Sequence, residues 1–260
     1  MSRSIYKVVL IGAGNVGHHL GHRFFEKGVQ VDQVFSRKIT KARKLAKAIN
    51  ASPINNLSQL GRDADLYIIA VHDDAIEEVA KQLSPLIEKR LVAHTSGAVA
   101  SVILKPYFKN YGCFYPLQTF SITKKADFEA LPLCIYSPQK ANLKKLERIA
   151  EIICPNVYEI NDPQKSALHV AAVFVNNFTN HLYSIAKQLT AKEDINFDIL
   201  KPLILETADK IQQHDPREMQ TGPARRGDKK TIQNHLHLLR GHPDWEELYQ
   251  LFSQAIEKEF

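Results

Sequence analysis

One short segment near the amino terminus constrains the fold more than any other feature. Residues 12–17 match the pattern G-x-G-x-x-G, directly after the apolar run 7–11 and at the start of a helix expected over 15–27. In this context the glycines allow a tight turn, leave backbone open to a pyrophosphate, and let the helix pack closely on the strand. The predicted dinucleotide-binding residues are Gly12, Ala13, Gly14, Asn15, Val16 and Gly17. A structural turn without a ligand is the alternative.

Strand-like and helix-like runs alternate through the first part of the chain. Strands are expected at 7–11, 31–35, 65–71, 91–93, 112–115 and 133–136, and helices at 15–27, 40–49, 75–83 and 140–152. This alternation is typical of a parallel sheet with right-handed crossovers. The fold class is therefore predicted to be α/β, with an N-terminal doubly wound Rossmann domain.

After Pro155 the periodicity becomes helical only. Helices are expected at 163–190, 196–213, 228–240 and 244–258. We therefore predict two domains, with a Rossmann domain over 1–158 and an all-helical substrate or dimerisation domain over 159–260.

The residues after the second strand bear on the choice of cofactor. A site for NAD usually has an acidic residue about 20 positions on, to bind the ribose 2′-hydroxyl. Here the strand is followed by Ser36, Arg37 and Lys38, and Asp32 lies at the strand's start. A hydroxyl and two cations suit a 2′-phosphate, so NADP(H) is the predicted cofactor. A solvated helix entrance is the alternative.

Two further loops are expected at the carboxyl edge of the sheet, where ligands of such folds bind. The backbone of Val71 and His72 is predicted to flank the dinucleotide, while Asp73 or Asp74 caps the next helix.

The second loop reads His94-Thr95-Ser96-Gly97. Thr95 is predicted to approach the cofactor, Ser96 the substrate, and His94 to donate a proton. A tight turn with a partly buried histidine is the alternative. Residues 115–119 could line the same cleft.

A row of polar residues crosses the apolar segment 163–189, whose centre is expected to be buried. At 3.6 residues per turn, His169, Asn176 and Asn180 fall within about 20° of one line, and Lys165 extends the row. A buried, unpaired polar group costs ~1–3 kcal/mol. The row is therefore predicted to face a wet cleft or a polar ligand. Hydrogen bonds at a subunit interface are the alternative.

The segment 221–228 breaks the helical pattern. Arg226 could hold an anionic group, and Asp228 is placed to cap the next helix, although a plain basic connector fits equally well. His18 and His22 have metal-compatible spacing, but no third ligand is apparent, so no metal is predicted.

Composition excludes several classes of protein. The formal charge of +6 is spread along the 260 residues without a basic tract, which suits an anionic metabolite better than nucleic acid. Three cysteines without a C-x-x-C pair indicate a reducing compartment. No apolar run is long enough for a membrane span, and residues 1–4 do not resemble a signal peptide. A cytoplasmic location is predicted.

With residues 12–17, 36–37, 94–97 and 221–228 in view, the chain resembles a bacterial family. Its members join a Rossmann-like domain to a helical domain of unknown function, and some are described as deazaflavin-dependent NADP oxidoreductases. The chain is more remotely similar to pyrroline-5-carboxylate reductase and the β-hydroxyacid dehydrogenases, whose helical domains usually dimerise. The latter have a catalytic lysine followed four residues later by asparagine. Lys165 matches that lysine, whereas His169 stands in place of the asparagine.

These features predict an NADP(H)-dependent oxidoreductase that moves a hydride between nicotinamide and a small carbonyl, imine or hydroxyacid. Lys165 or His169 would be the general acid. The predicted substrate-binding residues are His94, Ser96, Asn176, Asn180 and Arg226. A homodimer through the helical domain is expected. The alternative function is a redox sensor that binds NADP(H) without turnover.

Overall fold

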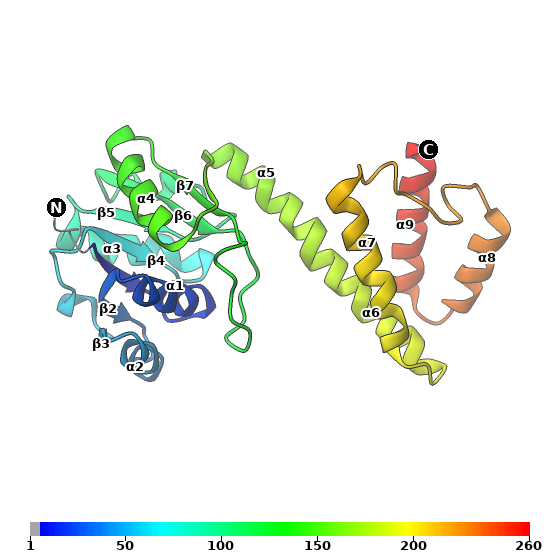
Figure 1. Cartoon of the computed structure of the whole chain (residues 1–260), viewed down its shortest axis with the longest axis horizontal. Helices are drawn as coiled ribbons and strands as arrows, with labels where there is room; N and C mark the ends of the chain where they lie inside the picture. Colours follow the sequence, from blue (N-terminus) through cyan, green and yellow to red (C-terminus); the bar gives the residue numbers. More distant parts are fainter. Residues whose placement is uncertain (1–5) are drawn as a thin grey trace. The chain divides into compact units, whose positions relative to one another are not determined.

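A single eight-stranded sheet organises the first part of the chain (Figure 1). The structure, a computed structural model, describes residues 6–260. The strand order is β3-β2-β1-β4-β5-β6-β7-β8. The strands are β1 (Lys7–Ile11), β2 (Gln30–Phe35), β3 (Ser52–Ile54), β4 (Leu66–Ile69), β5 (Leu91–His94), β6 (Asn110–Pro116), β7 (Leu133–Tyr136) and β8 (Val157–Glu159). The helices here are α1 (Asn15–Glu26), α2 (Ile39–Ala48), α3 (Ile76–Ile87), α4 (Lys140–Ile153) and α5 (Asp162–Ala172).

Helices cover both faces of this sheet because its central strands are apolar on both sides. Val8 and Leu10 of β1 pack in one layer with apolar residues of α1, α2 and α4. Val9 and Ile11 alternate to the opposite face and pack with residues of α3. The predicted doubly wound α/β domain is confirmed.

Three details of the sheet differ from the prediction. Strands β3 and β8 were not expected, since each has only three residues, most of them partly or fully exposed, and so lacks an apolar run. Strand β7 pairs antiparallel to β6, whereas a parallel sheet was expected. The connection 117–132 contains turns but no crossover helix, and a parallel pairing needs a crossover.

The chain divides into two compact units at Val175 and Asn176. The expected boundary at 158/159 stays a prediction. One helix was predicted over 163–190, but the structure has a π-helix, Val173–Phe178, between α5 and α6 (Thr179–Lys192). The π-helix could not be predicted, because its sequence is compatible with an ordinary α-helix.

The second unit is helical, as predicted. Besides α6 it contains a 3₁₀ turn (Phe197–Leu200) and the helices α7 (Lys201–Gln213), α8 (Lys229–Leu238) and α9 (Pro243–Glu259). Asp228 is the N-cap of α8 and accepts a hydrogen bond from the backbone of Thr231 at 3.1 Å, which confirms the predicted cap. No helix in the described residues is both long enough and apolar enough to cross a membrane. Residues 1–5, which bear on the signal-peptide prediction, lie outside the described part.

Candidate functional site

The glycine turn between β1 and α1 forms an open backbone cradle. Gly12 has a φ of +128°, and a Cβ added there would lie 2.1 Å from the carbonyl oxygen of Ala70. A Cβ on Gly17 would lie 2.1 Å from the carbonyl oxygen of Gly12. By contrast, a Cβ on Gly14 would meet nothing within 4 Å. Gly12 and Gly17 therefore let strand and helix approach, while Gly14 leaves empty space above the backbone.

This empty space lies at the start of α1, where backbone N–H groups lack partners within the helix. Gly14 is the N-cap, and no side chain caps it. The helix dipole adds partial positive charge at the same place. The turn therefore fits the pyrophosphate of a dinucleotide, which would take the space that a side chain at position 14 would fill.

The predicted residue Asn15 has a second task. Its side-chain amide donates to the carbonyl oxygen of Phe120 at 2.8 Å, and Nε2 of His19 lies 2.9 Å from the carbonyl oxygen of Ser121. The β6–β7 connection, residues 117–132, is therefore held against the amino-terminal half of α1.

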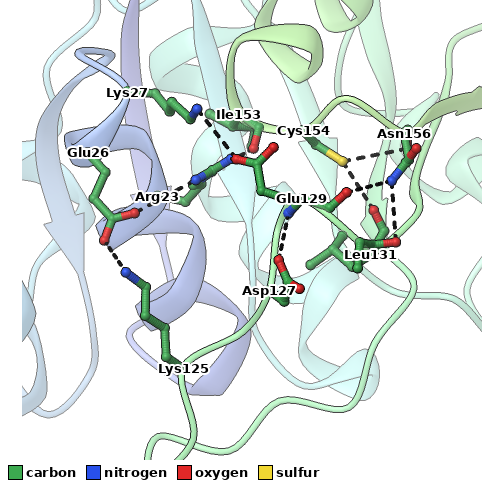
Figure 2. A network of polar contacts seen from close by, with 11 residues as sticks. Arg23, Glu26, Lys27, Lys125, Asp127, Glu129, Leu131, Ile153, Cys154 and Asn156 are labelled. Atoms are coloured by element: carbon green, nitrogen blue, oxygen red, sulfur yellow. Dashed lines mark hydrogen bonds and ion pairs between the residues drawn. The ribbon is translucent and has the colours of Figure 1, made fainter.

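The same connection is anchored to the other end of α1 (Figure 2). Arg23 donates from Nε to the carbonyl oxygen of Ile153 at 2.6 Å and from Nη2 to Glu129 at 2.5 Å. Nearby, Lys125 donates to Glu26 at 2.9 Å. The mostly buried Arg23 side chain thus joins α1 to the end of α4 and to residues 117–132.

Two cations and a hydroxyl lie at the carboxyl end of β2. The N–H of Ser36 donates to the carbonyl oxygen of Ile54, and its Oγ accepts from the N–H of Lys38 at 3.3 Å. Arg37 and Lys38 are exposed. Asp32 is directed toward Lys7, with 3.8 Å between its Oδ2 and the lysine Nζ. Residues 36–38 therefore present positive charge to solvent without a neighbouring acid in the sequence.

The end of β4 lies beside the glycine turn between β1 and α1. The backbone nitrogen of Val71 is 3.3 Å from the place a Gly12 Cβ would take, and His72 is exposed. The predicted capping by Asp73 or Asp74 is wrong, because α3 begins after Ala75 without a side-chain cap. The two aspartates lie instead in a short 3₁₀ turn before α3.

Lys165 of α5 is fully buried and holds the loop that follows β5. Its Nζ donates to the carbonyl oxygens of Ser96 at 3.0 Å, Gly97 at 3.3 Å, and Val99. An ammonium group has three N–H donors, and three carbonyls accept them here. The geometry makes Lys165 an anchor of this loop and leaves it no free donor for a substrate.

Asp162, one turn earlier, anchors the next part of the same segment. Its carboxylate accepts from the backbone N–H of Ser101 at 2.7 Å and from the Ser101 hydroxyl at 2.8 Å. The first turn of α5 therefore fixes residues 96–101 through one cation and one anion.

His94 was predicted to donate a proton, with a partly buried histidine in a tight turn as the alternative, and it lies in the interior of the first unit. The ring is fully buried, Nδ1 accepts from the N–H of Ser96 at 3.2 Å, and Nε2 has no partner among the described residues. Burial and the nearby Lys165 charge lower the pKa of His94 to about 4. His94 is thus a neutral, interior group. Thr95 is also mostly buried, and its N–H donates to the carbonyl oxygen of Ile69 at 3.1 Å.

His169, one turn after Lys165, is half-buried and lies beside Tyr115 at the end of β6. Its Nδ1 is 3.3 Å from the Tyr115 hydroxyl oxygen. Burial raises the pKa of Tyr115 to about 12. The sequence placed Tyr115 only in a segment that could line the cleft. The signal that would have found it is a tyrosine at the carboxyl end of a buried strand.

The remaining predicted residues belong to the second unit, and Asn176, Asn180 and Arg226 are all exposed. The predicted row assumed an unbroken α-helix, whereas the π-helix Val173–Phe178 interrupts it, so the row beyond His169 stays a prediction. The apolar centre is also not buried in the single chain, since Val175 is 73% exposed. Apolar composition predicts that a surface is covered, but not which chain covers it.

Comparison with known proteins adds the family. The family model described as "NADP oxidoreductase coenzyme F420-dependent" matches residues 7–97, and the domain of unknown function DUF2520 matches residues 131–256. A Bacteroides fragilis protein described as a "putative NADP oxidoreductase" is 37% identical, with a TM-score of 0.91; the match covers 97% of this chain and 98% of that one. The chain belongs to the same family as this putative NADP oxidoreductase. A comparison with curated proteins gives no match.

Two more distant structures share the fold. A Thermotoga maritima protein is 22% identical with a TM-score of 0.73, and 97% of each chain is covered. An imine reductase from Myxococcus stipitatus, solved in complex with NADP+, is 16% identical with a TM-score of 0.67, covering 97% of this chain and 92% of its own. At these identities the likeness concerns the fold alone.

Proposed function

We propose that this protein is an NADP(H)-dependent oxidoreductase that moves a hydride between nicotinamide and a small carbonyl, imine or hydroxyacid. The open space above Gly14 carries the proposal, because it leaves room for a pyrophosphate at the positive end of α1. The family model for NADP oxidoreductases over residues 7–97 supports NADP as the cofactor. Ser36, Arg37 and Lys38 are the residues that would bind its 2′-phosphate.

When bound, the nicotinamide supplies or takes up the hydride. The chain's contribution is orientation and proton transfer. His169 is the proposed proton donor, because it is half-buried beside Tyr115, near the carboxyl end of strand β6. Its Nδ1 contacts Tyr115, which leaves Nε2 for a substrate. Lys165, the other predicted donor, is proposed to hold residues 96–99 in place for the cofactor. Asn176, Asn180 and Arg226 stay predicted substrate contacts.

The cofactor assignment is tested by titrating the protein with NADPH and NADH in a calorimeter. Arg37→Asp should weaken NADPH binding at least tenfold, about 1.4 kcal/mol, and leave NADH binding equal or tighter. Arg43→Asp, on the exposed side of α2, is the matched control and should change neither affinity by more than about twofold. Equal loss of both cofactors in Arg37→Asp would contradict a 2′-phosphate contact.

The catalytic assignment is tested with a substrate found by a thermal-shift screen of carbonyls, imines and hydroxyacids in the presence of NADPH. His169→Gln should lower kcat about 100-fold, the lower range for a general acid, without changing NADPH affinity. The exposed His237→Gln is the control. NADPH binding without turnover of any compound would instead favour the redox-sensor function.

The proposal extends to the cellular setting. A chain of +6 formal charge with three free, buried cysteines suits a reducing, cytoplasmic compartment and an anionic small molecule. A homodimer through the helical unit is proposed because several large apolar side chains are exposed there. They include Ile199, Leu203, Leu205, Leu238 and Leu251.

A further inference from the structure

Tyr115 and His169 form a side-chain pair, of which the proposed reaction gives a role only to His169. The Tyr115 hydroxyl oxygen and the His169 Nδ1 are 3.3 Å apart, and the ring centroids are 6.3 Å apart at an interplanar angle of 67°. Tyr115 lies near the carboxyl end of β6 and His169 lies on α5, so the pair joins two elements of the first unit. The edge-on arrangement directs the phenol toward a ring nitrogen and not toward the ring face.

The backbone of Gly97 packs directly against this pair. A Cβ at position 97 would lie 2.6 Å from the His169 Nδ1, 2.6 Å from the Tyr115 Cζ and 2.8 Å from its hydroxyl oxygen. No other residue type fits there without moving the pair. The carbonyl oxygen of Gly97 is also bound by Lys165, one helical turn before His169. The contact between the two rings is therefore held by a fixed piece of backbone.

The surroundings of Tyr115 determine whether its hydroxyl is protonated. Its ring packs with the buried Cys113 and Cys134 in an apolar cluster. That burial raises the pKa of Tyr115 to about 12, so its hydroxyl keeps its proton under ordinary conditions. In the neutral tautomer of His169 whose proton lies on Nε2, the hydroxyl donates to Nδ1. When His169 is a cation, Nδ1–H donates to the hydroxyl oxygen instead.

We infer that Tyr115 is a positioning residue that fixes Nδ1 of His169 and so makes Nε2 the atom that exchanges a proton with the substrate. The inference rests on the proposed function. In the reducing direction His169 starts as a cation, with its Nδ1–H donated to the Tyr115 hydroxyl oxygen. The substrate carbon gains a hydride, the π electron pair of the C=O or C=N bond moves to the heteroatom, and that atom takes the proton from Nε2. His169 is left neutral with its remaining proton on Nδ1, and Nε2 regains a proton from solvent, while Tyr115 keeps its own.

The hydrogen bond can be tested on the protein without a cofactor by ¹⁵N NMR of labelled histidine. At alkaline pH, the Nδ1 resonance of His169 should lie at lower frequency in the wild type than in Tyr115→Phe, because only the wild type has a donor to Nδ1. His169→Gln assigns the signal. Tyr111→Phe, the same change at the other end of β6, should leave it in place. Identical Nδ1 resonances in the wild type and Tyr115→Phe would overturn the inference.

Replacement of Tyr115 by 3-fluorotyrosine keeps the ring and makes the phenol a stronger donor. It should move the Nδ1 resonance further in the wild-type direction, which a purely packing role would not do. This variant keeps the test decisive if Tyr115→Phe does not fold.

Kinetics separate this inference from the proposed function. Tyr115→Phe should lower kcat about tenfold, the effect of losing one hydrogen bond, and leave NADPH affinity within about twofold. Unchanged kcat with normal NADPH binding would overturn the role of Tyr115 and leave the oxidoreductase proposal standing. If the wild type binds no NADPH, the proposed function fails, whereas the NMR result still decides whether the pair exists.

Discussion

At the scale of single residues, His94 shows how burial sets a group's chemistry. The ring is fully buried, and its Nε2 has no partner among residues 6–260. A neutral imidazole tolerates this environment, while a cation there would lose its hydration and lie near the positive charge of Lys165. His94 therefore stays neutral in the folded protein.

This burial predicts a dependence of stability on pH. The pKa of His94 is about 4 in the folded protein, below its ordinary value of 6.5, so the unfolded chain binds the proton more readily. Stability is fully present above pH 6.5 and falls between about pH 6.5 and 4, by ~1.4 kcal/mol per pH unit. His94→Gln should reduce the slope by about that amount in urea unfolding at several pH values. The exposed His237→Gln should keep the wild-type slope, and an unchanged slope in His94→Gln would contradict the account.

Residues in short local patterns could be predicted from the sequence, whereas pairs distant along the chain could not. Gly12 to Gly17 and Ser36 to Lys38 each follow a strand within a few consecutive residues, so their pattern can be read from the sequence. Lys165 donates to the carbonyl oxygen of Ser96, 69 positions away in the chain. Tyr115 contacts His169, which is 54 positions away. Only the fold brings those partners together, so sequence spacing carried no signal for them.

At the scale of elements, the mostly buried Arg23 connects the carboxyl-terminal half of α1 to two other segments (Figure 2). Its side chain is 11% exposed and donates to a main-chain carbonyl as well as to Glu129. Lys125, in the same network, is 80% exposed and pairs with Glu26. Charge-assisted hydrogen bonds from a mostly buried group contribute more than an exposed ion pair, which is worth ~0–1 kcal/mol.

Arg23→Ala should therefore destabilise the protein by about 1–3 kcal/mol and speed hydrogen exchange in residues 117–132. Lys125→Ala, the control in the same network, should change the free energy of unfolding by less than about 1 kcal/mol. Thermal unfolding and hydrogen-exchange mass spectrometry measure both effects. Equal effects of the two substitutions would show that burial of Arg23 does not determine its contribution.

Element type was predictable from a continuous apolar run in β1 and from helical periodicity in α1 and α4. Strands β3 and β8 were missed because three partly exposed residues are too few to give a pattern. The π-helix Val173–Phe178 was missed because its sequence is compatible with an ordinary helix.

At the scale of the whole molecule, the exposed apolar residues of the helical unit favour the proposed homodimer. Leu205 of α7 is 67% exposed, and large exposed apolar patches mark interaction surfaces. Light scattering should give twice the chain mass of 29.5 kDa for the wild type. Leu205→Glu should shift the protein toward that chain mass, and Gln212→Glu on the same helix should not. A monomeric wild type would contradict the dimer.

The central claim is that a dinucleotide lies on the open backbone above Gly14, and one calorimetric comparison tests it directly. Gly14→Ala adds a methyl group where the protein has space, so the melting temperature should fall by no more than about 4 °C, while NADPH affinity falls at least tenfold. Gly17→Ala, which meets the Gly12 carbonyl, should lower stability itself. A Gly14→Ala protein that binds NADPH as tightly as the wild type, or a wild type that binds neither nicotinamide cofactor, would contradict the account.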